Sequence, residues 1–210
     1  MNQETKTRIL DSAERLFAQD GIDATSLRAI TDSANANLAA VNYHFGSKEA
    51  LVHAVFGRRL RPLNERRLQM LDAAIAADPT DLPGILRAFA LPMLETAFQP
   101  PHEGSPVNIG SLLIRLYTEP AQLVERGFNE QMACTAARFV NAVRAALPHL
   151  PEPVLYWRIH FCVGCLAHTM NARPILSALS HGIIDTNSPE QAFENMLPFL
   201  KAGLTAPSEV

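Results

Sequence analysis

Residues 25–51 read TSLRAITDSANANLAAVNYHFGSKEAL, and this stretch decides how the N-terminal third of the chain folds. Either Thr25 or Ser26 can cap a first short helix, because hydroxyl oxygens accept hydrogen bonds from the free amides of a first helical turn. Asn37 can cap a second short helix, from Leu38 to His44. Two short helices separated by a turn of a few residues are typical of a helix-turn-helix motif.

Amphipathic helices are predicted on both sides of this stretch. From Thr5 to Ala18 the apolar residues Ile9, Ala13, Leu16 and Phe17 recur at spacings of three and four, which gives one buried stripe. Gly21 stops that helix, and Gly46 ends the second short helix before a long helix that continues to about Ala77. A small core is expected from Ile9, Phe17, Leu27, Ile30, Leu38, Val41 and Phe45.

The remainder of the chain also reads as helix. Pro and Asp mark a linker over residues 78–83, and a second loop covers residues 99–106. Pro174 is expected to kink or break the long penultimate helix, because proline lacks the backbone donor that a helix interior needs. Alternating strand patterns of useful length are absent from the sequence. We therefore predict an all-α protein with a three-helix head over residues 1–50 and an all-helical body over residues 51–210. The helical runs expected in the body cover roughly 85–98, 107–118, 120–146, 152–180 and 189–204.

Composition sets the class of protein. The 210 residues carry a net charge of −3, with 48% hydrophobic and 19% charged residues, as in a globular chain able to bury a core. Residues 1–67 carry a net charge of +2 and residues 68–210 a net charge of −5, which suits a small DNA-reading head better than a general nucleic-acid coat. Three cysteines, no signal-peptide core and no apolar run of membrane-spanning length lead us to expect a cytoplasmic protein that does not enter a membrane.

The second short helix has side chains suited to the major groove. Ala39 and Ala40 are small, so the helix backbone can approach base edges closely, and an alanine methyl can contact a thymine methyl. Asn42 could pair with adenine, while Tyr43 and His44 could donate hydrogen bonds to phosphates. Two cations, Arg28 and Lys48, flank this surface as clamps.

The run from Thr25 to Ile30, followed by the run from Ala39 to Leu51, resembles the DNA-binding signature of TetR-family transcriptional regulators. The resemblance covers residues 5–56 and implies a helix-turn-helix fold, a homodimer, a palindromic operator in double-stranded DNA and a ligand-sensing C-terminal domain. Many members have an aromatic residue where this chain has Asn42, so the operator sequence does not carry over. By position, the expected DNA-binding residues are Ser26, Arg28, Asn37, Leu38, Ala39, Ala40, Asn42, Tyr43, His44 and Lys48.

The resemblance also implies that the last two long helices form an intersubunit four-helix bundle. The match over residues 37–51, together with residues 156–161, further resembles a TetR subgroup that regulates fatty-acid degradation and senses long acyl chains. A small, largely apolar effector, such as a fatty acid or acyl-CoA, is therefore expected, and the protein is expected to be a repressor. Candidate effector-binding residues are Phe89, Met93, Leu113, Leu116, Tyr117, Phe128 and Phe161.

The body carries no sequence motif of an enzyme, so we expect neither catalysis nor a cofactor. Cys162, Cys165 and His168 form C-x-x-C-x-x-H, but spacings of three spread these side chains across half the circumference of a helix, an awkward geometry for one metal ion. Structural thiols are the default interpretation, and no metal is expected. Two alternatives stay open: a thiol- or metal-responsive regulator using these three residues, and an all-helical enzyme using His160 and His168.

Overall fold

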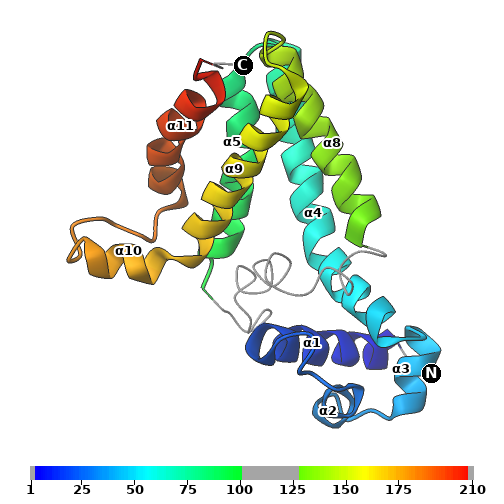
Figure 1. Cartoon of the computed structure of the whole chain (residues 1–210). Helices are drawn as coiled ribbons and strands as arrows, with labels where there is room; N and C mark the ends of the chain where they lie inside the picture. Colours follow the sequence, from blue (N-terminus) through cyan, green and yellow to red (C-terminus); the bar gives the residue numbers. More distant parts are fainter. Residues whose placement is uncertain (1–2, 101–127, 208–210) are drawn as a thin grey trace. The chain divides into compact units, whose positions relative to one another are not determined.

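The computed structural model describes residues 3–100 and 128–207, with the side chains of residues 128–132 left out. Within these ranges the chain is helical and contains no strand, which confirms the predicted all-α class (Figure 1). The helices are α1 (Gln3–Asp20), α2 (Leu27–Ser33), α3 (Leu38–His44), α4 (Lys48–Ala77), α5 (Leu82–Phe98), α8 (Phe128–Ala146), α9 (Glu152–Asn171), α10 (Arg173–Leu179) and α11 (Pro189–Thr205).

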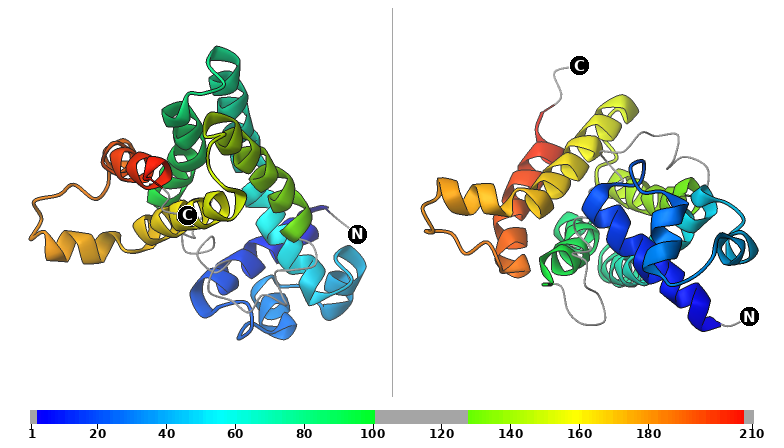
Figure 2. Two further views of the ribbon diagram at one scale, coloured as in Figure 1. Left: turned by 45° about the horizontal axis from the view of Figure 1, so that its top comes forward. Right: turned by 90° about the horizontal axis from the view of Figure 1, so that it is seen from below.

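The described residues divide into two compact units, one of which contains residues 3–62, 99–100 and 128–132. In this unit α1, α2 and α3 pack against one another in pairs (Figure 2). The predicted stripe of α1 is confirmed, since Ile9, Ala13 and Phe17 are fully buried. Ile30 from α2 and Val41 from α3 are also fully buried, and the pairwise packing of α2 and α3 on α1 fixes the two short helices.

The other unit comprises residues 63–98 and 133–207. Its centre is α5, which packs most extensively against α11 and also against α9 (Figure 1). Apolar side chains from the three helices are fully or almost fully buried there, among them Ile85, Leu94, Leu155, Phe193 and Leu204. Within the described ranges, no helix combines the length and hydropathy that crossing a membrane requires.

Helix α4 belongs to both units, and the division falls between Pro62 and Leu63 inside this one helix. Proline cannot donate the backbone hydrogen bond of its position, so Pro62 weakens α4 at this point. The predicted domain boundary after residue 50 lies within the first turn of α4.

The penultimate helical run is broken near Pro174, as its proline led us to expect. Helix α9 ends at Asn171, Ala172 caps it, and α10 then begins at Arg173 with Pro174 in its first turn. Helix α10 packs mainly against the end of α9, the helix that it follows. The predicted helix over 107–118 and the start of the one over 120–146 lie outside the described residues.

Candidate nucleic-acid interface

Helix α3 presents one side to the core of its unit and one side to solvent. Ala40 and Val41 point inward and are 4% and 0% exposed. On the opposite side of the helix, Leu38 and Tyr43 point outward with 51% and 72% of their surface exposed, and Ala39 and Asn42 are exposed between them. The outward side of α3 therefore presents the small side chains of Ala39 and Asn42 between the large side chains of Leu38 and Tyr43.

Side-chain caps fix where the two short helices begin. The Ser26 hydroxyl accepts a hydrogen bond from the Ala29 amide at 3.1 Å, and the Asn37 Oδ1 accepts one from the Ala40 amide at 2.9 Å. Both capping residues have the extended backbone that this role requires. The predicted caps are confirmed, and with Oδ1 engaged, the amide nitrogen of exposed Asn37 is the atom left to meet a ligand.

Two substitutions separate the capping role of Asn37 from its predicted contact with DNA. Asn37→Ala should lower the free energy of unfolding by about 1 kcal/mol, or a melting temperature by about 2–4 °C, because the Ala40 amide loses its acceptor. Asn37→Ser should keep that stability, since serine caps as well as asparagine. Calorimetry with a DNA-binding titration on both variants checks this; if serine restores DNA affinity fully, the amide nitrogen makes no contact.

The end of α3 depends on a glycine. Gly46 has a φ of 80°, and its amide donates to the Asn42 carbonyl at 3.0 Å, which closes the helix. Residues with a side chain rarely adopt this left-handed conformation. Gly46 therefore lets the chain turn from α3 into α4, and the Ser47 hydroxyl caps α4 by accepting from the Ala50 amide at 3.1 Å.

Two predicted DNA-facing residues lie elsewhere. Ala40 is buried, so the expectation that its methyl reaches a base edge is wrong; it packs on the inward side of α3 beside Val41. His44 is half-buried, and its Nε2 is enclosed, with no hydrogen-bond partner among the described residues. Its ring packs edge-on against Tyr43 at 5.1 Å and against Phe45, so this nitrogen does not face outward to a phosphate.

The two predicted cationic clamps differ in their surroundings. Arg28 is exposed at the start of α2. Lys48, the first residue of α4, is half-buried and donates from Nζ to the Asp23 carbonyl at 3.4 Å. An amine held by one long hydrogen bond retains donors for a phosphate.

A buried carboxylate ties α1 to the first part of α4. Glu14 is 2% exposed and accepts hydrogen bonds from two guanidinium groups, at 2.7 Å from Arg59 and also from Arg58. Arg58 further pairs with Asp11 at 2.6 Å. Burial disfavours the charge on Arg58, but the bonds to Glu14 and Asp11 outweigh it, and the pKa of Arg58 is raised. The ion cluster fixes α4 to α1, the helix against which α2 and α3 pack.

Two family models match this chain. The model described as bacterial regulatory proteins of the tetR family matches residues 9–55, which include α2 and α3. The model described as a tetracyclin repressor-like C-terminal domain matches residues 87–203, more than half of the chain. The chain belongs to the TetR family. It is a DNA-binding regulator of transcription, and the predicted family resemblance is confirmed; the fatty-acid subgroup remains a prediction.

Named relatives agree with this assignment. The transcriptional regulator TtgR of Pseudomonas putida is 33% identical over 89 residues, which are 42% of this chain and 40% of TtgR. AcrR of Shigella flexneri is 34% identical over 94 residues, 45% of this chain and 42% of AcrR. The matched part thus spans about two fifths of the length of these curated relatives. These relatives and both families are regulators of transcription and not enzymes.

Solved structures share the fold. The hemolysin II regulator HlyIIR superposes with a TM-score of 0.60 at 20% identity, covering 92% of this chain and 97% of its own. A complex of SmeT with triclosan superposes with a TM-score of 0.55 at 18% identity, covering 99% of this chain and 97% of its own. At such low identity, this TetR-family chain shares with them the fold alone.

The candidate effector residues fall into three groups. Phe89 is half-buried and Met93 is 4% exposed, both on α5 in the interior of the second unit. Phe161 is 63% exposed on α9, so its placement as a cavity-lining core residue is wrong; its ring stacks on Trp157 instead. The side chains of Leu113, Leu116, Tyr117 and Phe128 lie outside those that the structure describes.

Sequence reasoning missed a buried cation beside Phe89. Arg67 on α4 is 5% exposed, and its guanidinium carbon lies 5.3 Å from the ring centre of Phe89 and 4.9 Å from that of Phe139. Its Nη1 also donates to the Asn64 Oδ1 at 3.0 Å. Asn64 and Arg67 lie on the same buried side of α4 as Leu60, Leu63 and Leu71. Polar residues within an apolar stripe are the sequence signal that could have indicated buried polar groups here.

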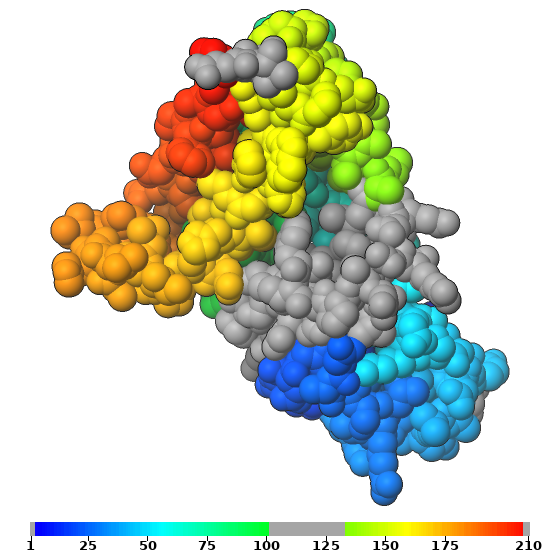
Figure 3. Space-filling model, in the orientation of Figure 1, coloured from blue at the N-terminus to red at the C-terminus, as the bar shows by residue number. Residues whose placement is uncertain are grey.

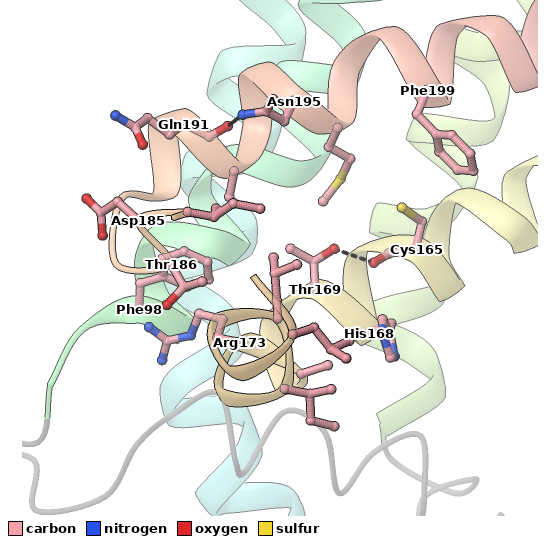
Figure 4. A pocket seen from close by; sticks show the side chains of 17 residues that line it. Phe98, Cys165, His168, Thr169, Arg173, Asp185, Thr186, Gln191, Asn195 and Phe199 are labelled. Carbon is pink, nitrogen blue, oxygen red and sulfur yellow. Dashed lines mark hydrogen bonds between the residues drawn. The ribbon is translucent and has the colours of Figure 1, made fainter. Parts of the chain in front are cut away.

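The thiols of α9 are shielded. Cys162 is 7% exposed, and burial raises its pKa to about 11; burial also raises the pKa of half-buried Cys165. Among the described residues, no group of three or more His, Cys, Asp and Glu side chains is arranged to hold a metal ion. His160 and His168 are both exposed on α9, and His168 lines a pocket at the end of this helix (Figure 4).

The thiols should differ in reactivity. At pH 7.5 a thiol with a pKa of about 11 is ionised to only about 0.03%, so Cys162 should react with Ellman's reagent far more slowly than exposed Cys134. Its rate should rise about tenfold per pH unit between pH 7 and 9, since the thiolate is the reactive species. Peptide mass mapping after timed labelling measures both sites. Equal labelling of Cys134 and Cys162 at pH 7.5 would favour the thiol-sensor alternative.

Proposed function

We propose that this TetR-family chain is a homodimeric, ligand-responsive repressor that is released from a palindromic operator by a small, largely apolar effector. The observation that carries the proposal is the outward side of α3, where Leu38, Ala39, Asn42 and Tyr43 are exposed on a helix whose inward side is fully packed. A rigid, exposed helix of this kind is what the major groove admits. The repressor acts in the cytoplasm, on double-stranded DNA.

Each head reads one half of the operator. Ala39, which is small, and Asn42, which is polar, contact base edges. Tyr43, Arg28 and Lys48 contact the sugar-phosphate backbone. Two heads related by a two-fold axis reach successive major grooves when they stand about 34–36 Å apart, so the operator is palindromic. Helices α9 and α11 supply the contact between the two chains.

The effector is an apolar molecule with an acidic group. Phe89 and Met93 supply apolar surface in the second unit, and Arg67, buried beside Phe89 and Phe139, is suited to a carboxylate. A fatty acid or acyl-CoA has this combination. SmeT, which shares the fold, forms a complex with the small molecule triclosan, so the fold accommodates small ligands.

Helix α4 transmits the effect of effector binding to the helices that bind the operator. Its first part is fixed to α1 through Glu14, and its second part carries Arg67. Pro62 lies between these two parts. An effector that favours one arrangement of α4 by about 1–3 kcal/mol changes operator affinity about 5- to 150-fold.

Selection of duplexes from a random DNA pool with the purified full chain tests the proposal. We expect an inverted repeat to be enriched, and its affinity to fall about 1,000-fold or more between 50 and 200 mM salt, because several phosphates are contacted. Palmitic acid or palmitoyl-CoA should then weaken the complex. No enrichment would contradict operator binding, whereas enrichment without a response to either lipid would contradict only the effector class.

A further inference from the structure

The cations of the first unit differ in how far the fold itself neutralises them. Arg58 and Arg59 are held by carboxylates, those of Asp11 and Glu14. In the described part of the chain, Lys6 near the start of α1 pairs with no carboxylate and donates no side-chain hydrogen bond. Its charge therefore remains available to an anion from outside the molecule.

A row of aromatic rings connects Lys6 to the outward side of α3. The ammonium nitrogen of Lys6 lies 5.9 Å from the ring centre of Phe45, the residue that caps the end of α3. The ring centres of Phe45 and His44 are 6.1 Å apart, and those of His44 and Tyr43 are 5.1 Å apart. Tyr43 is 72% exposed, so this row leads from the Lys6 amine to the side of α3 that faces solvent.

Lys48 lies at the same end of α3, on the next helix. Only Gly46 and Ser47 separate it from Phe45, so its amine belongs to the turn that leads from α3 into α4. Donors from three helices, those of Lys6, Tyr43 and Lys48, thus lie near the end of α3. Figure 3 shows the first unit as one surface, on which blue atoms of α1 adjoin the lighter blue and cyan atoms that lead to the start of α4.

Arg8, two residues after Lys6, is engaged by the protein itself. Its Nη2 donates to the Asn35 carbonyl at 3.1 Å, and its Nη1 lies 3.9 Å from the carboxylate of Glu4. Asn35 has a φ of 46°, a left-handed backbone that is uncommon outside glycine, so Arg8 holds the turn that leads into α3. Helix α1 therefore meets both ends of α3, with Arg8 at its start and Lys6 at its end.

We propose that Lys6 binds a phosphate of the operator, next to the phosphates that Tyr43 and Lys48 contact. A strand that borders the major groove passes the recognition helix, and a lysine there neutralises one phosphate. The ring of Phe45 holds the side chain in place beforehand, because the face of an aromatic ring attracts an ammonium group whose N–H donors stay available. This contact rests on the proposed function and adds α1 to the helices that bind the operator.

Operator affinity of the full chain at several salt concentrations tests the contact. Each neutralised phosphate contributes about −0.9 to the slope of log affinity against log salt. Lys6→Gln should make the slope shallower by about 0.9 and lower affinity about tenfold at 0.1 M salt, without changing the sequence selected. Lys6→Arg should restore both values, because it keeps the charge. Lys201→Gln is the matched control, since Lys201 is an exposed lysine on α11 in the second unit.

Neutral methylphosphonate groups, placed one at a time in the operator backbone, identify the phosphate. At the contacted position we expect the wild type to lose about tenfold in affinity and Lys6→Gln to lose nothing further, because the charge pair is already broken. Lys6→Met provides a second variant, since it keeps an unbranched side chain over Phe45. Its melting temperature should stay within about 4 °C of that of the wild type.

An unchanged salt slope in Lys6→Gln and Lys6→Met would overturn the contact. A loss of affinity without any phosphate coupled to Lys6 would also overturn it, because the lysine would then only position α3. If no operator is enriched from random DNA, the same salt titration on an arbitrary duplex still tests Lys6, since phosphate contacts do not depend on sequence. Failure of the proposed operator and failure of the Lys6 contact are thus distinguishable.

Discussion

Ala39→Glu should lower operator affinity by about 1,000-fold or more without changing the stability of the fold. Ala39 is exposed on the outward side of α3, so a larger side chain meets solvent in the free protein. In the complex, the same carboxylate would stand where the helix backbone approaches the bases, adding bulk and a negative charge between two phosphate backbones. About 4 kcal/mol of lost binding corresponds to this change in affinity.

Fluorescence anisotropy with a labelled duplex, combined with thermal unfolding, measures both properties. Ala73→Glu is the matched control, because Ala73 is also an exposed alanine within a helix but lies on α4 in the second unit. We expect the control to bind DNA as the wild type does. If Ala39→Glu binds the selected operator with wild-type affinity, α3 does not enter the groove.

Glu14→Ala is expected to lower the free energy of unfolding by about 3–5 kcal/mol. The carboxylate of Glu14 is almost fully buried. Its removal takes a negatively charged acceptor away from two largely buried guanidinium groups, those of Arg58 and Arg59. This is a large fraction of the stability of a typical domain. Because the cluster holds α4 against α1, the first unit should lose its helical packing before the second does.

Denaturant unfolding followed by circular dichroism provides the measurement. Asp11→Asn serves as the control, since Asp11 pairs with the same Arg58 but its side chain is 58% exposed, and exposed pairs contribute about 0–1 kcal/mol. A loss below about 1 kcal/mol for Glu14→Ala would show that the cluster does not stabilise the unit.

The head could be predicted from sequence because its signals are local. Ser26 and Asn37 cap the helices, and Gly46 ends α3 with a left-handed backbone, so each boundary depends on a neighbouring residue. Ala40 was misplaced because alanine fits both a packed core and a groove-facing surface, and α3 is too short for periodicity to distinguish its two sides.

The body was harder to predict, because the periodicity of a helix shows which side is apolar but does not show which element packs against that side. Phe161 is an aromatic residue in an apolar-rich stretch of α9, yet it is exposed and stacks on Trp157. A surface buried by a second copy and one buried within the chain have the same composition. Pro174 did mark the break before α10, but the direction in which α10 leaves α9 depends on tertiary contacts such as that of Arg173 with Phe98.

Methylation of guanine N7 by dimethyl sulfate, with and without bound protein, tests whether α3 enters the major groove of the selected operator, because this atom lies in that groove. We expect two protected major-groove patches separated by a whole number of helical turns, each of about 34–36 Å. Both patches should appear with wild-type protein and neither with Ala39→Glu. Protection confined to a single patch, or protection that persists with Ala39→Glu, would contradict a paired reading of the groove by α3.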